Sequence, residues 1–246
     1  MNPVEYQKMR ECEDLHWWYR SLHRYLLRLL PDYSGAGKRA LDVGCGTGGW
    51  MAELAGLGYA VAGFDLSAEA VEYAKRRGFA EVQVGDANRF PAPDDYFDLV
   101  TCVDVMECRE VDPPSVVGEM ARVLKPGGYA LLQMAAHQWL LSEHDVAVHS
   151  VRRYNRRQFR ALFDGSGLQV IRTTYLFGLL FPLMAIWKLA HPARTGRPAA
   201  AAVSDVKLPP LPVNHLLYAL CYLESLLFPD FSLPAGTSVC ALVRKA

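Results

Sequence analysis

The stretch that decides the fold of this 246-residue chain is Ala40-Leu41-Asp42-Val43-Gly44-Cys45-Gly46-Thr47-Gly48-Gly49. A short apolar run leads directly into a glycine-rich turn, and a helical pattern follows over residues 50–57. Glycines permit positive φ angles and let a ligand approach the backbone closely. The spacing is Gly-x-Gly-x-Gly after an acidic residue, unlike the dinucleotide fingerprint Gly-x-Gly-x-x-Gly. The stretch therefore predicts a strand, a ligand-binding turn and a helix, and it favours a cationic ligand bearing an amino acid over a pyrophosphate.

Short apolar runs alternate with helical patterns on both sides of this turn. The predicted strands are residues 40–43, 60–64, 82–84, 97–103, 129–134, 168–175 and 237–244. The predicted helices are residues 16–30, 50–57, 68–77, 115–124 and 157–163. Nearly continuous apolar strands that alternate with helices indicate an α/β fold, in which helices cover both faces of a parallel sheet. Ligands in such sheets bind beyond the carboxyl ends of the strands.

Composition limits the classes of partner and compartment. Lys plus Arg and Asp plus Glu both number 26, so no overall charge points to a nucleic acid, and none is expected as a partner. The six cysteines form no Cys-x-x-Cys pair, which indicates free thiols and a cytoplasmic location. The polar N-terminus lacks the apolar region of a signal peptide. No transmembrane span is expected, because the longest uncharged run, 173–187, is shorter than the about 20 apolar residues a spanning helix needs.

Three further landmarks follow the glycine turn. Asp65 ends the second strand, Gly85-Asp86-Ala87 follows the third, and residues 97–107 precede Leu124-Lys125-Pro126-Gly127-Gly128. In this order the set resembles the class I S-adenosylmethionine-dependent methyltransferase family, most closely over residues 39–134. The resemblance implies a doubly wound Rossmann-like sheet of seven strands with the last strand antiparallel, S-adenosyl-L-methionine as cofactor and S-adenosyl-L-homocysteine as product. A nucleotide-binding Rossmann turn of another kind is the alternative.

The same resemblance implies roles for individual residues. The glycine turn would line the methionine part of the cofactor, with Asp42 near its amino group; Asp65 would bind the ribose and Asp86 the adenine amino group. The opening His16-Trp17-Trp18-Tyr19-Arg20 is similar to that of methyltransferases whose first helix covers the cofactor, although core packing explains such aromatics equally well. The expected cofactor-binding residues are Tyr19, Arg20, Asp42, Gly44, Cys45, Gly46, Gly48, Asp65, Leu66, Asp86, Ala87 and Val103. The family often has Glu-His where this chain has Glu107-Cys108, so a contact by that histidine is not expected.

Residues after the fifth strand carry the candidate catalytic chemistry. Histidine, aspartate, arginine and tyrosine gather between 137 and 154. A neutral histidine can remove a proton near physiological pH, with a carboxylate fixing its tautomer, and arginine can bind a carboxylate or phosphate group. We expect His144, Asp145 and His149 to be catalytic and His137, Arg152, Arg153 and Tyr154 to bind the acceptor. A hydrogen-bonded loop that caps the next helix at Asn155 is the alternative, and no metal site is expected because the ligand spacing is irregular.

The chain is predicted to consist of an N-terminal helical lid (1–34), a cofactor-binding core (35–176 and 233–246) and an apolar helical insertion between the last two strands (177–232). The insertion contains the apolar segments 177–189 and 211–228, which must pack on each other, on a second copy of the chain, on a lipid surface or around an apolar acceptor. A helical hairpin that caps the sheet is the simplest of these alternatives.

The predicted function is methyl transfer to an oxygen, nitrogen or carbon atom of a small metabolite. The acceptor is expected to be apolar or to bear a carboxylate or phosphate. Homodimerisation and peripheral membrane contact stay open as alternatives for the insertion. A methyltransferase-fold enzyme that performs elimination, cyclisation or decarboxylation needs the same pocket, whereas a non-catalytic scaffold would typically have lost Asp65 or a loop glycine, and this chain keeps both.

Overall fold

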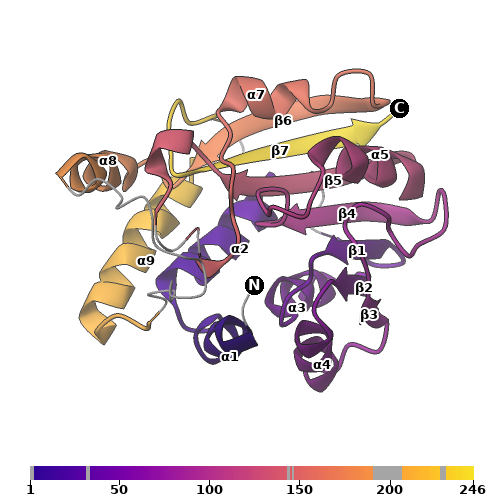
Figure 1. The fold of residues 1–246 in the computed structure, drawn as a ribbon, viewed down its shortest axis with the longest axis horizontal. Coiled ribbons are helices and arrows are strands. Elements are labelled where there is room, and N and C mark those ends of the chain that lie inside the picture. The colour runs from indigo at the N-terminus through magenta and orange to yellow at the C-terminus, as the bar shows by residue number, and fades with distance from the viewer. Residues whose placement is uncertain (1–2, 32–33, 143–144, 146, 191–206, 228–230) are drawn as a thin grey trace.

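The computed structural model describes residues 3–31, 34–142, 145, 147–190, 207–227 and 231–246. Their strands form a seven-stranded sheet in the order β3-β2-β1-β4-β5-β7-β6, which Figure 1 shows from β6 at the top to β3 at the bottom. The strands are β1 Arg39–Val43, β2 Ala60–Asp65, β3 Val82–Val84, β4 Phe97–Val103, β5 Leu124–Ala135, β6 Leu168–Leu176 and β7 Ser238–Lys245. Only β7 runs antiparallel to its neighbours, β5 and β6. The predicted seven-stranded Rossmann-like sheet is confirmed.

The helices agree with the predicted pattern in the core and add one at the N-terminus. They are α1 Pro3–Cys12, α2 Trp17–Leu29, α3 Gly49–Gly56, α4 Ala68–Arg76, α5 Pro113–Val123, α7 Arg156–Ala161, α8 Phe181–Ala190 and α9 Leu211–Ser225, with a short 3-10 turn at Gln138–Leu140. Asn155 and Gln158 form a reciprocal capping box at the start of α7, as the sequence suggested. Helix α1 was not predicted, because its sequence carries few apolar residues. No helix among the described ranges is both long and apolar enough to cross a bilayer.

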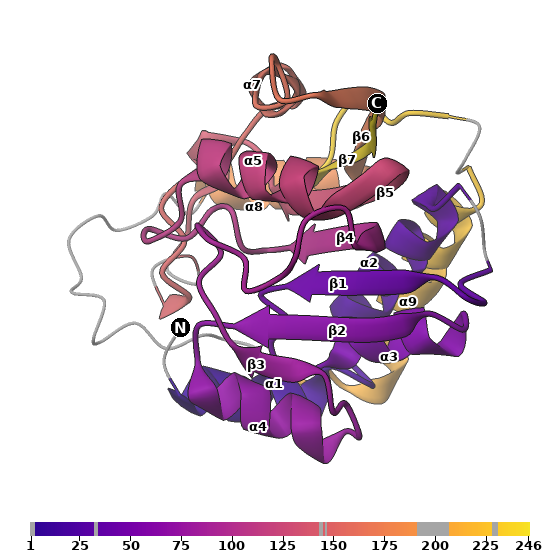
Figure 2. The ribbon, with the colours of Figure 1, turned by 90° about the vertical axis from the view of Figure 1, so that its right-hand side faces the viewer.

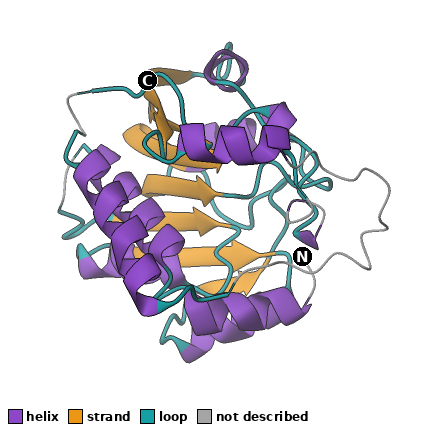
Figure 3. Ribbon diagram, turned by 90° about the vertical axis from the view of Figure 1, so that its left-hand side faces the viewer, coloured by secondary structure: helices purple, strands orange, loops and turns teal. Residues whose placement is uncertain are grey.

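Apolar side chains of the sheet alternate between two layers of core. In β1, Leu41 and Val43 face the helices α5 and α7, whereas Ala40 faces α2 and α3. Figure 3 shows helices on both sides of the strands. Both sides of the central strands are covered, so β1 and β4 are buried nearly throughout. Strand β5 begins five residues earlier than predicted because Leu124 pairs with Phe97.

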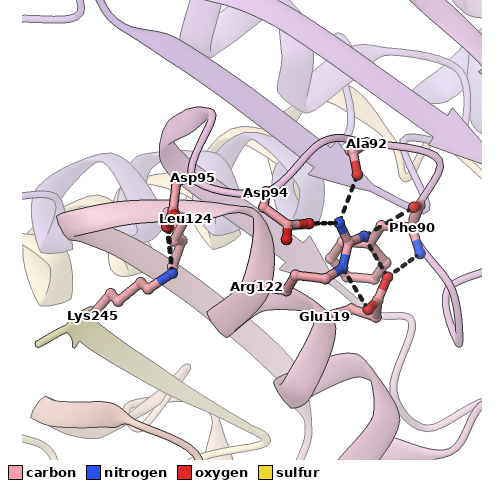
Figure 4. Close-up of polar contacts among 8 residues, drawn as sticks. All are labelled: Phe90, Ala92, Asp94, Asp95, Glu119, Arg122, Leu124 and Lys245. Atoms are coloured by element: carbon pink, nitrogen blue, oxygen red, sulfur yellow. Dashed lines mark hydrogen bonds and ion pairs between the residues drawn. The ribbon is translucent and has the colours of Figure 1, made fainter.

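Arg122 on α5 fixes the loop that leads into β4 (Figure 4). Its guanidinium donates hydrogen bonds to the Ala92 carbonyl (2.8 Å) and the Asp94 carboxylate (2.6 Å) and pairs with Glu119. Glu119 in turn accepts a hydrogen bond from the Phe90 amide (2.7 Å). This network stabilises the loop at the amino end of β4. Ligands in such sheets bind at the opposite, carboxyl ends of the strands.

The helices α2 and α9 pack against each other although about 200 residues separate them. The side chain of Asn214 accepts a hydrogen bond from the Trp17 amide (2.9 Å) and donates one to the Leu15 carbonyl (3.0 Å). Farther along, Arg24 Nε donates to Ser225 Oγ (2.7 Å). The N-terminal segment and the segment between β6 and β7 therefore form one structural unit on one face of the sheet.

Candidate active site

A cavity of about 1550 Å³ lies beyond the carboxyl ends of β1, β2 and β4. In Figure 2 the arrowheads of these three strands point to the same side of the molecule, where the N-terminus lies. The glycine turn, the ends of the strands, the helices α1, α2 and α8 and the segment after β5 contribute to its walls. Pockets for one small ligand usually measure about 300–1,000 Å³. The cavity thus has room for two reactants side by side.

The glycine turn leaves no space for side chains at its first position. A Cβ atom on Gly44 would lie 2.3 Å from Cγ2 of Val105, and Gly44 has a φ of +69°. The amides of Gly44 and Cys45 donate to the Phe64 carbonyl at 2.8 and 3.0 Å, which fastens the turn to the end of β2. Gly44, Cys45 and Gly46 line the cavity, whereas Gly48 packs against Ala74. The backbone itself therefore forms this wall.

Asp42, at the end of β1, is a buried carboxyl group that also lines the cavity. Its Oδ1 accepts a hydrogen bond from the Thr101 hydroxyl (2.8 Å). Burial raises the pKa of Asp42 to about 7, the Thr101 hydrogen bond opposes the shift, and the nearby Asp65 adds to it. A ligand with a positive charge at this position would supply the counter-charge that the carboxylate lacks.

Asp65, at the end of β2, gathers hydrogen-bond donors from three segments. Its Oδ2 accepts from the Gly46 amide (3.0 Å), and its Oδ1 accepts from the Ser67 amide (2.9 Å) and the Tyr6 hydroxyl (3.2 Å). The carboxylate is thereby held at the cavity wall beside the glycine turn. A carboxylate in this position can accept hydrogen bonds from the hydroxyl groups of a ribose.

The ends of β2, β3 and β4 supply the rest of the predicted cofactor wall. Leu66 is exposed (66%) and faces the cavity, as an apolar contact for a flat ring would require. The side chain of Asp86 accepts hydrogen bonds from the backbone amide (2.8 Å) and the side-chain amide (2.9 Å) of Asn88. Ala87 and Val103 complete the wall. The structure thus brings the predicted carboxylates from three strands to one cavity.

Tyr19 and Arg20 point in different directions from α2. Tyr19 lines the cavity. Burial, and to a smaller extent the charge of Glu13, raise the pKa of the Tyr19 hydroxyl. The guanidinium of Arg20 instead lies 4.0 Å from the centre of the Tyr218 ring on α9. This placement differs from the expectation that both residues approach the methionyl carboxylate, and its cause is the packing of α2 on α9.

Helix α1 and the residue after it contribute cavity residues that the sequence did not single out. Tyr6 and Met9 of α1 and the following Glu13 line the cavity. Glu13 is buried, accepts a hydrogen bond from the Thr47 hydroxyl of the glycine turn (2.6 Å) and pairs with Arg77 at the end of α4. The end of α1 is thus held at the glycine turn by a hydrogen bond and at α4 by a buried ion pair. The one available signal was a Tyr among acidic residues in a polar segment.

Among the described residues, Asp145 forms an ion pair with Arg153. Arg153 Nε donates to Oδ1 (3.0 Å) and Nη2 to Oδ2 (2.9 Å), a bidentate geometry between two largely buried groups. The amide and hydroxyl of Ser142 also donate to Asp145 Oδ2, both at 2.7 Å. Asp145, Arg153 and Ser142 line the cavity. The expected role of Asp145 in fixing a histidine tautomer stays a prediction, because His144 lies outside the described residues.

The other residues predicted after β5 lie outside the lining of the cavity or outside the described residues. His144 falls outside the described residues. The carbonyl of His149 accepts a hydrogen bond from the Arg109 amide (3.1 Å), and Arg152 Nη1 donates to the Val111 carbonyl (2.6 Å). The His137 ring stacks on Tyr175 with centroids 5.1 Å apart. Tyr154 packs against the α5 side of the core. These four described residues are not among those that line the cavity.

The far part of the cavity is apolar. Its lining includes Trp17 and Trp18 from α2, Phe177 at the end of β6 and three residues of α8, which are Leu183, Met184 and Trp187. Trp18 stacks on Phe177 with an interplanar angle of 7°. Lys188, also from α8, is largely buried, and its ammonium group donates to the Leu141 carbonyl. The segment between β6 and β7 therefore contributes directly to the site.

Comparisons with known proteins identify the family of this chain. A family model described as a methyltransferase domain matches residues 15–173. A ubiquinone biosynthesis O-methyltransferase of Thiobacillus denitrificans is 41% identical over 118 residues, which cover 44% of this chain and 50% of that protein. A protein of the same name from Photorhabdus laumondii is 29% identical over 225 residues, covering 77% and 91%. The chain belongs to the class I S-adenosylmethionine-dependent methyltransferase family. It spans about half the length of the Thiobacillus relative.

A solved structure shows the same fold with a bound cofactor product. The geranyl diphosphate C-methyltransferase of Streptomyces coelicolor, in complex with S-adenosyl-L-homocysteine, superposes with a TM-score of 0.62 at 16% identity and covers 92% of this chain and 80% of its own. At this identity the likeness concerns the fold alone.

The residues at the cavity wall fit S-adenosylmethionine. The backbone at Gly44 leaves no room for a Cβ atom, yet it lines the cavity, where a ligand can approach it. Asp42 is a buried carboxyl without a cationic partner among its described hydrogen bonds. A cofactor with an ammonium group and a sulfonium centre offers the positive charge that such a wall favours. The fit thus rests on the chemical groups at the wall, which are the backbone at Gly44 and the carboxyl group of Asp42.

Proposed function

We propose that this protein transfers a methyl group from S-adenosylmethionine to a hydroxyl oxygen of a small acceptor that has an apolar part. The observation that carries the proposal is the continuity of one cavity from the glycine turn and Asp65 to the apolar side chains of α2 and α8. Two relatives named O-methyltransferases support oxygen among the three expected acceptor atoms.

The cofactor is proposed to lie along the ends of β1 to β4. Its ribose is assigned to Asp65, its ammonium group to the neighbourhood of Asp42 and Val103, and its adenine to Leu66, Asp86 and Ala87. When bound, the cofactor supplies an activated methyl group and a good leaving group. The chain itself contributes alignment of the acceptor and exclusion of water, which are worth about 7–11 kcal/mol when the reactants are well placed.

The acceptor is proposed to bind with its apolar part against α8. Leu183 and Trp187 line the cavity although they are 65% and 53% exposed, so an apolar ligand would cover surface that water now contacts. Each buried methylene group contributes about 0.8 kcal/mol, or roughly a four-fold gain in affinity. The pair of Asp145 and Arg153 is assigned to positioning the wall, because both charges are already satisfied by each other.

The first experiment measures binding and transfer separately. Calorimetry with S-adenosylhomocysteine should detect binding, and Asp65→Ala should weaken it by about 10- to 150-fold, because a charged hydrogen bond is worth about 1.5–3 kcal/mol. An unchanged dissociation constant would remove Asp65 from the ribose role. Cofactor binding without methylation of any hydroxylated acceptor would instead support the elimination, cyclisation or decarboxylation alternative.

The second experiment tests the apolar subsite with 4-alkylcatechols of increasing chain length. We expect KM to fall as the chain lengthens. Leu183→Ser should flatten this dependence, whereas Ile186→Ser should keep it, because Ile186 is equally exposed (66%) but is not among the described lining residues. An equal effect of both substitutions would argue against acceptor binding at α8.

The outer surface of α8 and α9 supports the remaining expectations about partners. Exposed apolar side chains on these helices include Ile186, Leu189, Leu211, Leu216 and Leu223. Such a surface is compatible with homodimerisation or with peripheral membrane contact. Sedimentation with and without lipid vesicles would separate the two. The cytoplasmic location expected from the free cysteines remains a proposal.

A further inference from the structure

Glu107 is a buried carboxyl group at the cavity wall that the cofactor assignments leave unused. It follows β4, is only 4% exposed and lines the cavity. Its Oε2 has no hydrogen-bond partner among the described residues. Buried polar atoms in proteins are nearly always paired, so an unpaired carboxyl oxygen that faces a cavity points to a ligand.

A second carboxyl group holds Glu107 in place. The charge of Asp104 and a side-chain hydrogen bond with it both raise the pKa of Glu107. Asp104 Oδ1 also accepts a hydrogen bond from the Gln133 side chain (3.1 Å), and its amide donates to the Gln133 carbonyl (3.1 Å). Asp104 has a φ of +53°, an uncommon conformation for this residue type that the two Gln133 contacts hold. The pair is therefore built with fixed geometry.

The surroundings of Glu107 favour its protonated form. Burial, and then the charge of Asp104, raise the pKa of Glu107 well above its usual range. Neighbouring titratable groups are Cys102 on β4, Cys108 and Tyr154; burial raises the pKa of Cys108 to about 12 and raises those of the other two. All three are thus neutral at physiological pH.

We propose that Glu107 is the catalytic base of the reaction and that Asp104 is its positioning residue. This inference rests on the proposed function. In its ionised form, Glu107 accepts the proton of the acceptor hydroxyl. The acceptor oxygen forms the new bond to the methyl carbon, and the electron pair of the broken carbon–sulfur bond stays on sulfur. The Glu107 carboxylate and the sulfonium both become neutral, so charge balances, and Glu107 returns its proton to water when the products leave.

The test compares two acceptors that differ in acidity. Catechol is protonated at pH 8, whereas 4-nitrocatechol is already ionised and needs no base. With catechol, Glu107→Gln should lower kcat by about 10²- to 10⁴-fold, the usual contribution of a general base. With 4-nitrocatechol the loss should be under ten-fold. Equal losses with both acceptors, or no loss with catechol, would overturn the proposal.

Two further measurements separate chemistry from structure. Glu72→Gln alters an exposed carboxyl on α4, outside the cavity lining, and should leave both rates unchanged. Asp104→Asn removes the charge that raises the pKa of Glu107, so the rise of kcat with pH should move to lower pH; an unmoved profile would contradict the pairing.

A readout without turnover is the infrared band of a protonated carboxyl group. The wild-type protein should show this band at neutral pH and Glu107→Gln should lose it, while calorimetry should give both the same affinity for S-adenosylhomocysteine within about two-fold. A wild-type band that persists in Glu107→Gln would contradict the raised pKa of Glu107 and overturn the proposal. If the wild type binds the cofactor product but methylates neither acceptor, the proposed function fails and the base assignment fails with it, whereas loss of turnover in the variant alone leaves the proposed function intact.

Discussion

The hydroxyl group of Tyr6 donates a hydrogen bond to Oδ1 of Asp65, 3.2 Å away, and so ties α1 to the carboxylate at the end of β2. Asp65 already accepts hydrogen bonds from the amides of Gly46 and Ser67. A carboxylate offers about four lone-pair positions. Two ribose hydroxyl groups would therefore compete with Tyr6, and α1 is expected to move when the cofactor binds.

Tyr6→Phe should loosen α1 without changing the shape of the cavity. A hydrogen bond to a charged group contributes about 1.5 kcal/mol, so exchange of the α1 amides and the association rate of S-adenosylhomocysteine should each rise by about ten-fold. Hydrogen exchange and stopped-flow fluorescence measure the two quantities. Tyr96→Phe, at a partly exposed ring before β4, is the matched control. Unchanged exchange in Tyr6→Phe would show that this bond does not hold α1.

Asp42 should make stability depend on pH. Its pKa of about 7 in the folded protein exceeds the ordinary value of 3.8, so the folded state binds the proton more tightly. The contribution of Asp42 to stability is complete below pH 3.8 and is lost as pH rises through 7, a change of about 4 kcal/mol at 1.36 kcal/mol per pKa unit. Urea unfolding at pH 5 and pH 8 should show a smaller loss for Asp42→Asn than for the wild type. Parallel curves for the two proteins would contradict the raised pKa.

The Glu13–Arg77 pair should stabilise the fold more than an exposed pair does. Both side chains are largely buried, at 4% and 12% exposure. Removal of one partner of a buried pair costs about 3–5 kcal/mol, so Glu13→Ala should lower the free energy of unfolding by about that amount. Glu81→Ala breaks the exposed pair with Arg39 and should cost at most about 1 kcal/mol. Similar costs for both would mean that Glu13 is better hydrated than its burial indicates.

Arg153→Lys should damage the cavity wall because an ammonium group cannot make two parallel bonds to Asp145. We expect a loss of about 1.5–3 kcal/mol in the free energy of unfolding and a higher KM for the acceptor, with the affinity for S-adenosylhomocysteine unchanged. Arg152→Lys is the control, since its hydrogen bond to the Val111 carbonyl needs one donor. A weakened cofactor affinity in Arg153→Lys alone would place this pair on the cofactor side of the cavity.

The order of strands and helices and the cofactor wall could be predicted from local sequence. Asp42 and Asp65 lie within the last two residues of β1 and β2, Asp86 lies two residues after β3, and parallel strands bring their carboxyl ends to a common edge. The side chain at such a position is placed by the backbone of its own strand. The position of these carboxylates at one cavity could be predicted because the information lies within a few residues of each one.

The side-chain contacts of the segments after β4 and β5 could not be predicted from the local sequence. Asp145 and Arg153 are eight residues apart, yet nothing local favoured their ion pair over a histidine contact. Glu107 was noted only for the residue after it, and its burial beside Asp104 became visible only in the folded chain. Long side chains on loops have many partners within reach, and packing selects among them.

The sequence by itself determined the sheet, the glycine turn and the carboxylates at the strand ends, since strand alternation and glycine conformations are properties of short segments. The tertiary structure alone decided that Tyr19 faces the cavity while Arg20 lies on Tyr218 of α9. Neighbouring residues on a helix point about 100° apart, so which of them reaches the site depends on the face that the rest of the molecule covers.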